Sequence, residues 1–185
     1  MFLKDENVIV LDFLQHGHSI GRQEPIAQVI GTKYFSILEV VVKQDVILKN
    51  GDLVYIGDDK RDKIDHIKRR IGINELTSFA KSELPFIVEK LVKENEPRFV
   101  EFFNTARPLS TRLHQLELLP GVGKKHMWDV IDERKKGPFK NFEDIKSRIK
   151  LMPDPMGSVI KRIMEEIEDD NIRYRLFVAG PVKKF

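Results

Sequence analysis

The sequence contains no cysteine among its 185 residues. This absence excludes disulfide bonds, thiolate metal sites and cysteine nucleophiles. Long hydrophobic runs are also missing, since the longest apolar stretch, residues 37–42, is interrupted by Glu39. A bilayer span needs roughly 18–20 such residues. The first residues lack the basic start and apolar core of a secretion signal, so we expect a cytoplasmic protein that makes no membrane contact.

The chain also has little excess charge, with 32 Lys plus Arg against 29 Asp plus Glu. The distribution along the chain is uneven. Residues 1–106 carry 15 basic and 17 acidic side chains, residues 107–162 carry 13 and 7, and residues 163–185 carry 4 and 5. The positive middle segment indicates an anionic partner, although a solvated helical surface would give the same excess.

What is present is a composition typical of a folded domain, with 41% hydrophobic and 33% charged residues. The first part of the chain, residues 1–73, reads as a β domain, because runs rich in β-branched residues alternate with turn signals such as Asn50-Gly51. The expected strands are residues 8–14, 26–30, 34–42, 53–56 and 63–71. Short strands of this kind predict a small barrel of OB (oligonucleotide-binding) or related type, with Phe35 in its core.

Residues 74–107 then read as a packed helical connector. Thr77 is a candidate N-cap for a helix over residues 78–84, and Pro85 suits the first turn of a following helix. Several aromatic residues recur at helical spacing, which a flexible linker would not carry. We therefore predict an α+β protein in which a small OB-like β barrel precedes a helical part.

The most informative stretch is a turn between two expected helices. Ser110 is a candidate cap for a helix over residues 111–119, and a second helix is expected to begin at or just after Gly123. Glycines on both sides of Val122 permit a tight turn, with Val122 inserted between the helices. The free N–H groups and positive dipole of the second helix form an anion site suited to phosphate. The expected phosphate-binding residues are Gly121, Val122, Gly123, Lys124 and Lys125.

This stretch resembles the helix-hairpin-helix motif of sequence-nonspecific nucleic-acid-binding proteins. The resemblance continues through residues 134–145, where basic residues precede Gly-Pro-Phe and then a capped Glu-Asp-apolar helix. A second hairpin would lie near residues 151–158, but the Gly-apolar-Gly pattern is absent there. We assign residues 108–170 to this domain and expect residues 171–185 to contain a strand that packs back on the body. The expected basic rim consists of Arg112, Arg134, Lys135, Lys136 and Lys140.

Over nearly its full length the chain is similar to the domain-of-unknown-function 655 family, which is mostly archaeal and generally described as predicted RNA- or nucleotide-binding. The segments that carry the resemblance are Leu11-Asp12, residues 35–39, 51–57, 62–66, 69–71, 99–104 and 112–121. The resemblance implies an OB-like domain joined to a helix-hairpin-helix domain. It implies no catalytic residue and no established ligand.

The β domain offers a second set of candidate contacts. Basic residues on the rim of the expected barrel could follow a phosphate backbone, and its tyrosines could stack on bases. A charged edge strand and a core filled by aromatic residues explain the same residues equally well. The candidates are Tyr34, Tyr55, Arg61, Lys63, Arg69 and Arg70.

No catalytic site, metal site or cofactor is expected from the sequence. His16 and His18 have no apparent third ligand, and the acidic pairs lack a further carboxylate at metal spacing. No Gly-rich loop of the nucleotide-binding type ends in Gly-Lys-Ser/Thr. The predicted function is therefore non-enzymatic, largely sequence-nonspecific binding of nucleic acid, with RNA favoured and DNA the other candidate. The alternative is a protein-interaction or structural module in which the hairpin only packs domains. A nucleic-acid-processing enzyme with an unrecognised site is a third, weaker alternative.

Overall fold

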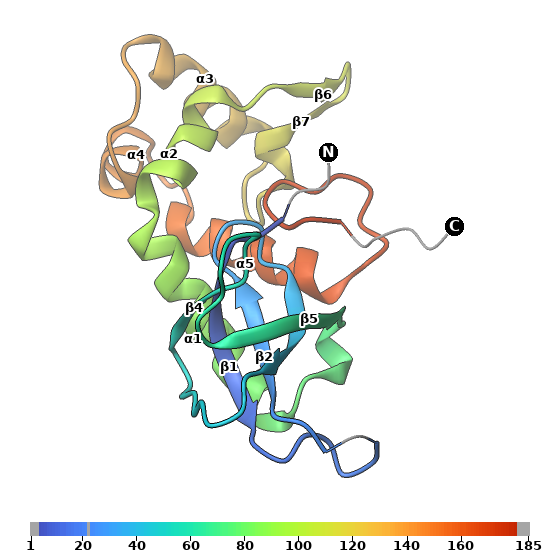
Figure 1. The fold of residues 1–185 in the computed structure, drawn as a ribbon. Helices are drawn as coiled ribbons and strands as arrows, with labels where there is room; N and C mark the ends of the chain where they lie inside the picture. The colour runs from blue at the N-terminus through green and yellow to red at the C-terminus, as the bar shows by residue number, and fades with distance from the viewer. Residues whose placement is uncertain (1–3, 22, 181–185) are drawn as a thin grey trace. The chain divides into compact units, whose positions relative to one another are not determined.

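The computed structural model describes residues 4–21 and 23–180 (Figure 1). The described residues form two compact units: residues up to 87 together with residues 166–180, and residues 88–165. Strands dominate the first unit and helices the second, which confirms the predicted α+β class. The first crossing between the units, after residue 87, falls within the segment predicted as a helical connector, and the second, after residue 165, falls within the segment predicted as the helix-hairpin-helix domain.

The first unit is built on a five-stranded antiparallel sheet that curls into a half-barrel (Figure 1). Its strands are β1 (Asn7–Leu14), β2 (Ile26–Gly31), β3 (Ile37–Val42), β4 (Leu53–Tyr55) and β5 (Ile64–Arg70). The order in the sheet is β4-β1-β2-β3-β5, so β4 and β5 are edges and the predicted barrel does not close by pairing them.

Alternating β-branched residues explain why these strands form. Val8, Val10, Val29 and Val40 are fully buried in one apolar cluster, because successive side chains of a strand point to opposite faces. Phe35 is also buried, as expected, but it lies in the turn before β3 with φ at +54°. The third strand therefore begins at Ile37 rather than at residue 34.

One continuous helix, α1 (Ser78–Glu94), replaces the two helices expected around Pro85. Thr77 caps it as predicted, since its Oγ1 accepts a hydrogen bond from the N–H of Ala80 at 3.0 Å. Pro85 lies inside the helix and is exposed, so the helix continues past a residue that cannot donate a backbone hydrogen bond. The short 3₁₀ helix η1 (Ile73–Glu75) precedes this helix.

The strand expected in the C-terminal segment is not formed by residues 174–180. The carboxylate of the fully buried Glu166 instead accepts the backbone N–H groups of Leu176, Phe177 and Val178, at 2.7, 3.0 and 2.9 Å. These donors are therefore used by a side chain rather than by a neighbouring strand. Residues 181–185 of the same predicted segment lie outside the described residues.

The second unit contains most of the helical part of the chain. Its elements after α1 are α2 (Glu96–Thr105), β6 (Pro108–Ser110), β7 (Leu113–His114), η2 (Gln115–Leu118), α3 (Lys124–Lys135), α4 (Phe142–Arg148) and α5 (Pro155–Glu168). Phe103 is fully buried and meets the ring of Phe142 edge-on, with centroids 6.5 Å apart. Leu116, Leu119 and Val130 are buried in the same unit.

The helix predicted over residues 111–119 is wrong. A short β6–β7 hairpin and the 3₁₀ helix η2 occupy this stretch. At the start of η2, Nδ1 of His114 accepts the N–H of Leu116 at 3.2 Å, and the Glu117 carboxylate accepts the N–H of His114 at 2.8 Å. This reciprocal capping begins a tight turn at residue 115, so no α-helix can run through it.

Candidate functional site

The turn between η2 and α3 is held by three contacts. Val122 is buried, and its N–H donates to the carbonyl of Leu119 at 3.0 Å. The carbonyl of Pro120 accepts the hydroxyl of Ser158 at 2.9 Å. These contacts fix the backbone of the turn, while Gly121 and Gly123 remain exposed.

The two glycines of the turn have different roles. Gly121 has φ at +83°, and a Cβ there would lie 3.0 Å from the side chain of Pro153. Gly123 has φ at −88° and open space around the position of a Cβ. The tight turn therefore requires a glycine only at position 121, because the backbone of Gly123, the N-cap residue of α3, is one that other residues also adopt.

The N-terminus of α3 is open, as the sequence predicts. Gly123 has no side chain to cap it, and the first helical hydrogen bond runs from Met127 N–H to the Gly123 carbonyl at 2.9 Å. The N–H groups of Lys124, Lys125 and His126 precede that bond and have no acceptor within residues 4–21 and 23–180. These donors stand at the positive end of the helix dipole.

Asn95 likewise makes no side-chain cap at the start of α2, whereas side chains cap the starts of α4 and α5. At α4, the side chain of Asn141 accepts the N–H of Asp144 at 2.7 Å. At α5, the Asp154 carboxylate accepts the N–H of Gly157 at 3.1 Å. The start of α5 thus already carries a carboxylate of its own, which gives a physical reason why a phosphate would be disfavoured there.

Two lysines stand at the open start of α3. Lys124 and Lys125 are exposed, and neither forms an ion pair or side-chain hydrogen bond in the described part of the chain. Each ammonium group can therefore turn toward an anion without first breaking an internal contact.

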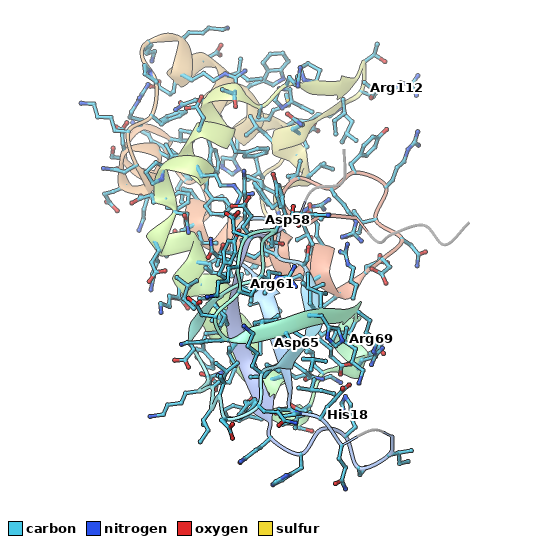
Figure 2. The ribbon with its side chains drawn as sticks, viewed as in Figure 1. His18, Asp58, Arg61, Asp65, Arg69 and Arg112 are labelled. Atoms are coloured by element: carbon cyan, nitrogen blue, oxygen red, sulfur yellow. The ribbon has the colours of Figure 1, made fainter. Side chains whose placement is uncertain are left out.

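The predicted rim residues divide into those with free side chains, those in ion pairs and one that binds backbone carbonyls. Arg112 is exposed at the tip of the β6–β7 hairpin (Figure 2), and Lys140 is exposed before α4. Lys135 pairs with Asp132 at 2.8 Å, and Lys136 pairs with Glu133. Exposed pairs of this kind contribute about 0–1 kcal/mol, so they exchange readily for another anion.

Arg134 is the exception among the rim residues. Its Nη1 donates to the carbonyls of Phe103 and Ala106 at 3.1 and 2.9 Å, so the guanidinium supports the end of α2. Its charge also acts on His114: burial, and then the charge of Arg134, lower the pKa of that imidazole. Arg134 is therefore a structural residue of this unit.

Most of the predicted contacts in the first unit are also engaged internally. Arg61 donates to the carbonyl of Gly57 at 2.8 Å, and the hydroxyl of Tyr55 accepts the N–H of Asp59 at 3.2 Å. Arg70 donates to the carbonyls of Gly180 and Ala179. Tyr34 is half-buried, with Lys33 above its ring. Lys63 is exposed, and its ammonium group has no partner among the residues described.

Arg69 belongs to a buried polar network that the sequence did not reveal. Its Nε donates to the carboxylate of Glu39 at 2.9 Å, and that carboxylate also binds Nε2 of His18 at 2.7 Å and Nε2 of Gln28 at 3.3 Å. Figure 2 shows Arg69 on β5 and His18 in the loop that follows β1. Burial alone would raise the pKa of Glu39, but the hydrogen bonds from His18 and Gln28 and the charge of Arg69 lower it overall. Glu39 is thus ionised and paired, and it ties three distant segments together.

Arg148 is the centre of a second network of contacts, which sequence reasoning missed. Its guanidinium lies 4.4 Å from the ring centroid of Phe139 and donates to the carbonyl of Gly137 at 3.0 Å. It also pairs with Glu133 and Asp144. The pair with Asp144 has the local i,i+4 spacing of a helix, whereas the contacts with Glu133, Gly137 and Phe139 have no local signal in the sequence. The segment that follows α3 is therefore held in place by a residue of α4.

The comparisons with known proteins cover almost the whole chain. The model of the family described as "Protein of unknown function (DUF655)" matches residues 4–179. The chain belongs to the DUF655 family.

Two DUF655 relatives are archaeal. The uncharacterised protein MJ0038 of Methanocaldococcus jannaschii is 46% identical over 170 residues, which cover 91% of this chain and 77% of that protein. The second relative, Af1531 from Archaeoglobus fulgidus, has a crystal structure described as a DUF655 family model, and its sequence is 44% identical to this chain. It covers 95% of this chain and 100% of its own, with a TM-score of 0.85. The fold described above is therefore similar to that of a solved DUF655 protein.

Within residues 4–21 and 23–180, no helix is both long and apolar enough to cross a membrane. In the same ranges, no group of three His, Asp or Glu side chains is arranged to hold a metal ion.

Proposed function

We propose that this chain binds the sugar-phosphate backbone of a nucleic acid at the turn formed by residues 121–125. The observation that carries the proposal is the open start of α3, where three N–H groups without acceptors among the described residues meet two unpaired lysines. Backbone N–H groups at a helix N-terminus bind phosphate because they donate hydrogen bonds from the positive end of the dipole.

In this proposal the turn and α3 correspond to the second half of a helix-hairpin-helix motif. The first helix of such a motif is represented by the 3₁₀ helix η2, which is a departure from the usual pattern. The curled sheet of the first unit is assigned to the OB-like type on the same family resemblance.

The surrounding positive field comes from a smaller rim than the sequence predicted. Arg112, Lys135, Lys136 and Lys140 are exposed, whereas Arg134 is committed to backbone carbonyls. Contacts from such residues position a nucleic acid without reading its sequence. The proposed binding is therefore largely independent of sequence and non-enzymatic. RNA is favoured over DNA on the family resemblance alone.

A structural module is the second candidate. It is favoured by the packing of the turn against residues near the start of α5, where Ser158 binds the Pro120 carbonyl and Pro153 lies next to Gly121. In that case the hairpin would serve only to hold this unit together.

The test is a fluorescence-polarisation titration with labelled single-stranded RNA, single-stranded DNA and duplexes at 50 and 200 mM salt. We expect K124A/K125A to weaken binding of all sequences about equally. The dependence of log affinity on log salt should also fall by about one for each lysine removed. K81A/K90A, which removes two exposed lysines from α1, is the matched control and should bind as the parent does. Equal affinity of K124A/K125A and the parent, or no binding by the parent, contradicts the proposal.

A further inference from the structure

We propose that Trp128 stacks on an unpaired base, so that the binding surface on α3 selects single-stranded nucleic acid. This inference rests on the proposed function and names the form of its ligand. Trp128 is the one tryptophan of the 185-residue sequence and lies in the second turn of α3.

The first observation is that Trp128 does not pack in the core. It is 58% exposed, whereas its helix neighbours Met127 and Val130 are 6% and 0% exposed. No aromatic or cation–π contact of its ring occurs within residues 4–21 and 23–180. The buried side of α3 is therefore complete without the indole, whose ring is available to a partner.

The second observation is the position of the indole beside two cations. Lys124 and Lys125 precede Trp128 by four and three residues, which places all three on one side of the helix. Side chains of an α-helix lean toward its N-terminus, so the indole covers the turn from which the two lysines project. The rise over four residues is only about 6 Å.

The third observation concerns the acidic residues of the same helix. Asp132 follows Trp128 by one turn and is paired with Lys135 at 2.8 Å. Asp129 is half-buried. Among the charged residues of α3 near the indole, the exposed and unpaired ones are therefore Lys124 and Lys125.

This combination determines the chemistry of the ligand. Exposed single hydrophobic residues are common, so the indole alone would indicate nothing. A flat aromatic surface next to two free cations complements a molecule in which flat rings alternate with phosphates. In a duplex the faces of the bases are covered by their neighbours, whereas a single strand can turn one base onto an aromatic ring.

The fluorescence of Trp128 provides a direct test, because no other tryptophan in the sequence contributes to it. We expect a twelve-nucleotide oligouridylate or oligothymidylate to quench this emission, and a twelve-base-pair duplex to quench it far less at equal occupancy. W128A should lower single-strand affinity about 5- to 100-fold, as measured by polarisation, and leave duplex affinity nearly unchanged. W128F should retain most of the affinity. F86A, which removes an aromatic residue that is 68% exposed on α1, is the control.

The outcomes separate this inference from the function on which it rests. If the parent binds no nucleic acid, the proposed function fails. If the parent binds but W128A binds single strands as tightly, stacking is excluded and backbone binding stands. If the parent self-associates in a centrifuge and W128A does not, the indole forms a protein contact and the inference is overturned.

Discussion

Individual residues decide the local geometry of the turn between η2 and α3. Gly121 and Gly123 have the same side chain and flank the same valine, yet their backbones differ. Only Gly121 lies in the left-handed region, and only its missing Cβ would contact another side chain. Sequence spacing identifies both glycines but cannot show which of them the turn requires, because that depends on Pro153.

We therefore predict that Gly121→Ala destabilises the protein and that Gly123→Ala has a smaller effect. The left-handed conformation costs a non-glycine residue about 1–2 kcal/mol, before the contact with Pro153 is counted. This corresponds to a fall in Tm of about 2–8 °C for a chain of this size. Gly123→Ala only places a less favourable residue at the N-cap of α3, which lowers the free energy of unfolding by about 0.5–1 kcal/mol. Thermal unfolding followed by circular dichroism measures both changes, and a larger loss for Gly123→Ala would contradict the assignment.

At the scale of elements, local sequence patterns predict strands and helix starts correctly. The five strands follow from runs of β-branched residues, and the start of α3 follows from Gly123, because both signals are local. The failed helix over residues 111–119 shows the limit. Its leucines, Leu113, Leu116 and Leu119, recur every three residues, a spacing that a 3₁₀ turn satisfies as well as an α-helix.

Contacts between distant segments were beyond prediction for a different reason. In the sequence, Glu39 only interrupts an apolar run. In the structure, its carboxylate binds His18, Gln28 and Arg69. The hydrophobic character of residues 176–178 suggests a strand, whereas their N–H groups bind a carboxylate of α5. One sequence carries no signal for such pairings.

For the C-terminal segment we predict that Glu166→Gln releases residues 174–180. The amide of glutamine has one acceptor oxygen, and its NH₂ group would face backbone donors. Leaving buried N–H groups without an acceptor costs about 1–3 kcal/mol. Hydrogen exchange at Leu176, Phe177 and Val178 should become faster, and trypsin should cut sooner after Arg173 or Arg175. Glu168→Gln, an exposed neighbour, is the control. Unchanged exchange at the three amides would show that the carboxylate does not hold this segment.

At the scale of the whole molecule, charge links stability to pH. The folded pKa of Glu39 is lowered, so its ionised form stabilises the folded state above its ordinary value of 4.5. That contribution disappears as the pH falls through the lower folded pKa, because the proton then binds in both states. Acid unfolding of the sheet unit should depend on this carboxylate.

We expect Glu39→Gln to be less stable than the parent at pH 7 and to lose less further stability below pH 4.5. When Tm is measured between pH 7 and pH 3, the curves of Tm against pH for the parent and for Glu39→Gln should converge at the acid end. Glu6→Gln, at an exposed position before β1, should leave the shape of the curve unchanged. Curves that remain parallel would show that Glu39 does not titrate as the contacts require.

The order of the two units along the chain has a consequence for synthesis. The sheet unit uses residues from both sides of the helical unit, and its last contacts come from Glu166 and the segment that follows. Residues 88–165 are synthesised before that segment. The sheet unit therefore lacks its final piece while the residues of the helical unit are being made. Translation completes the sheet unit last, although most of that unit is made first.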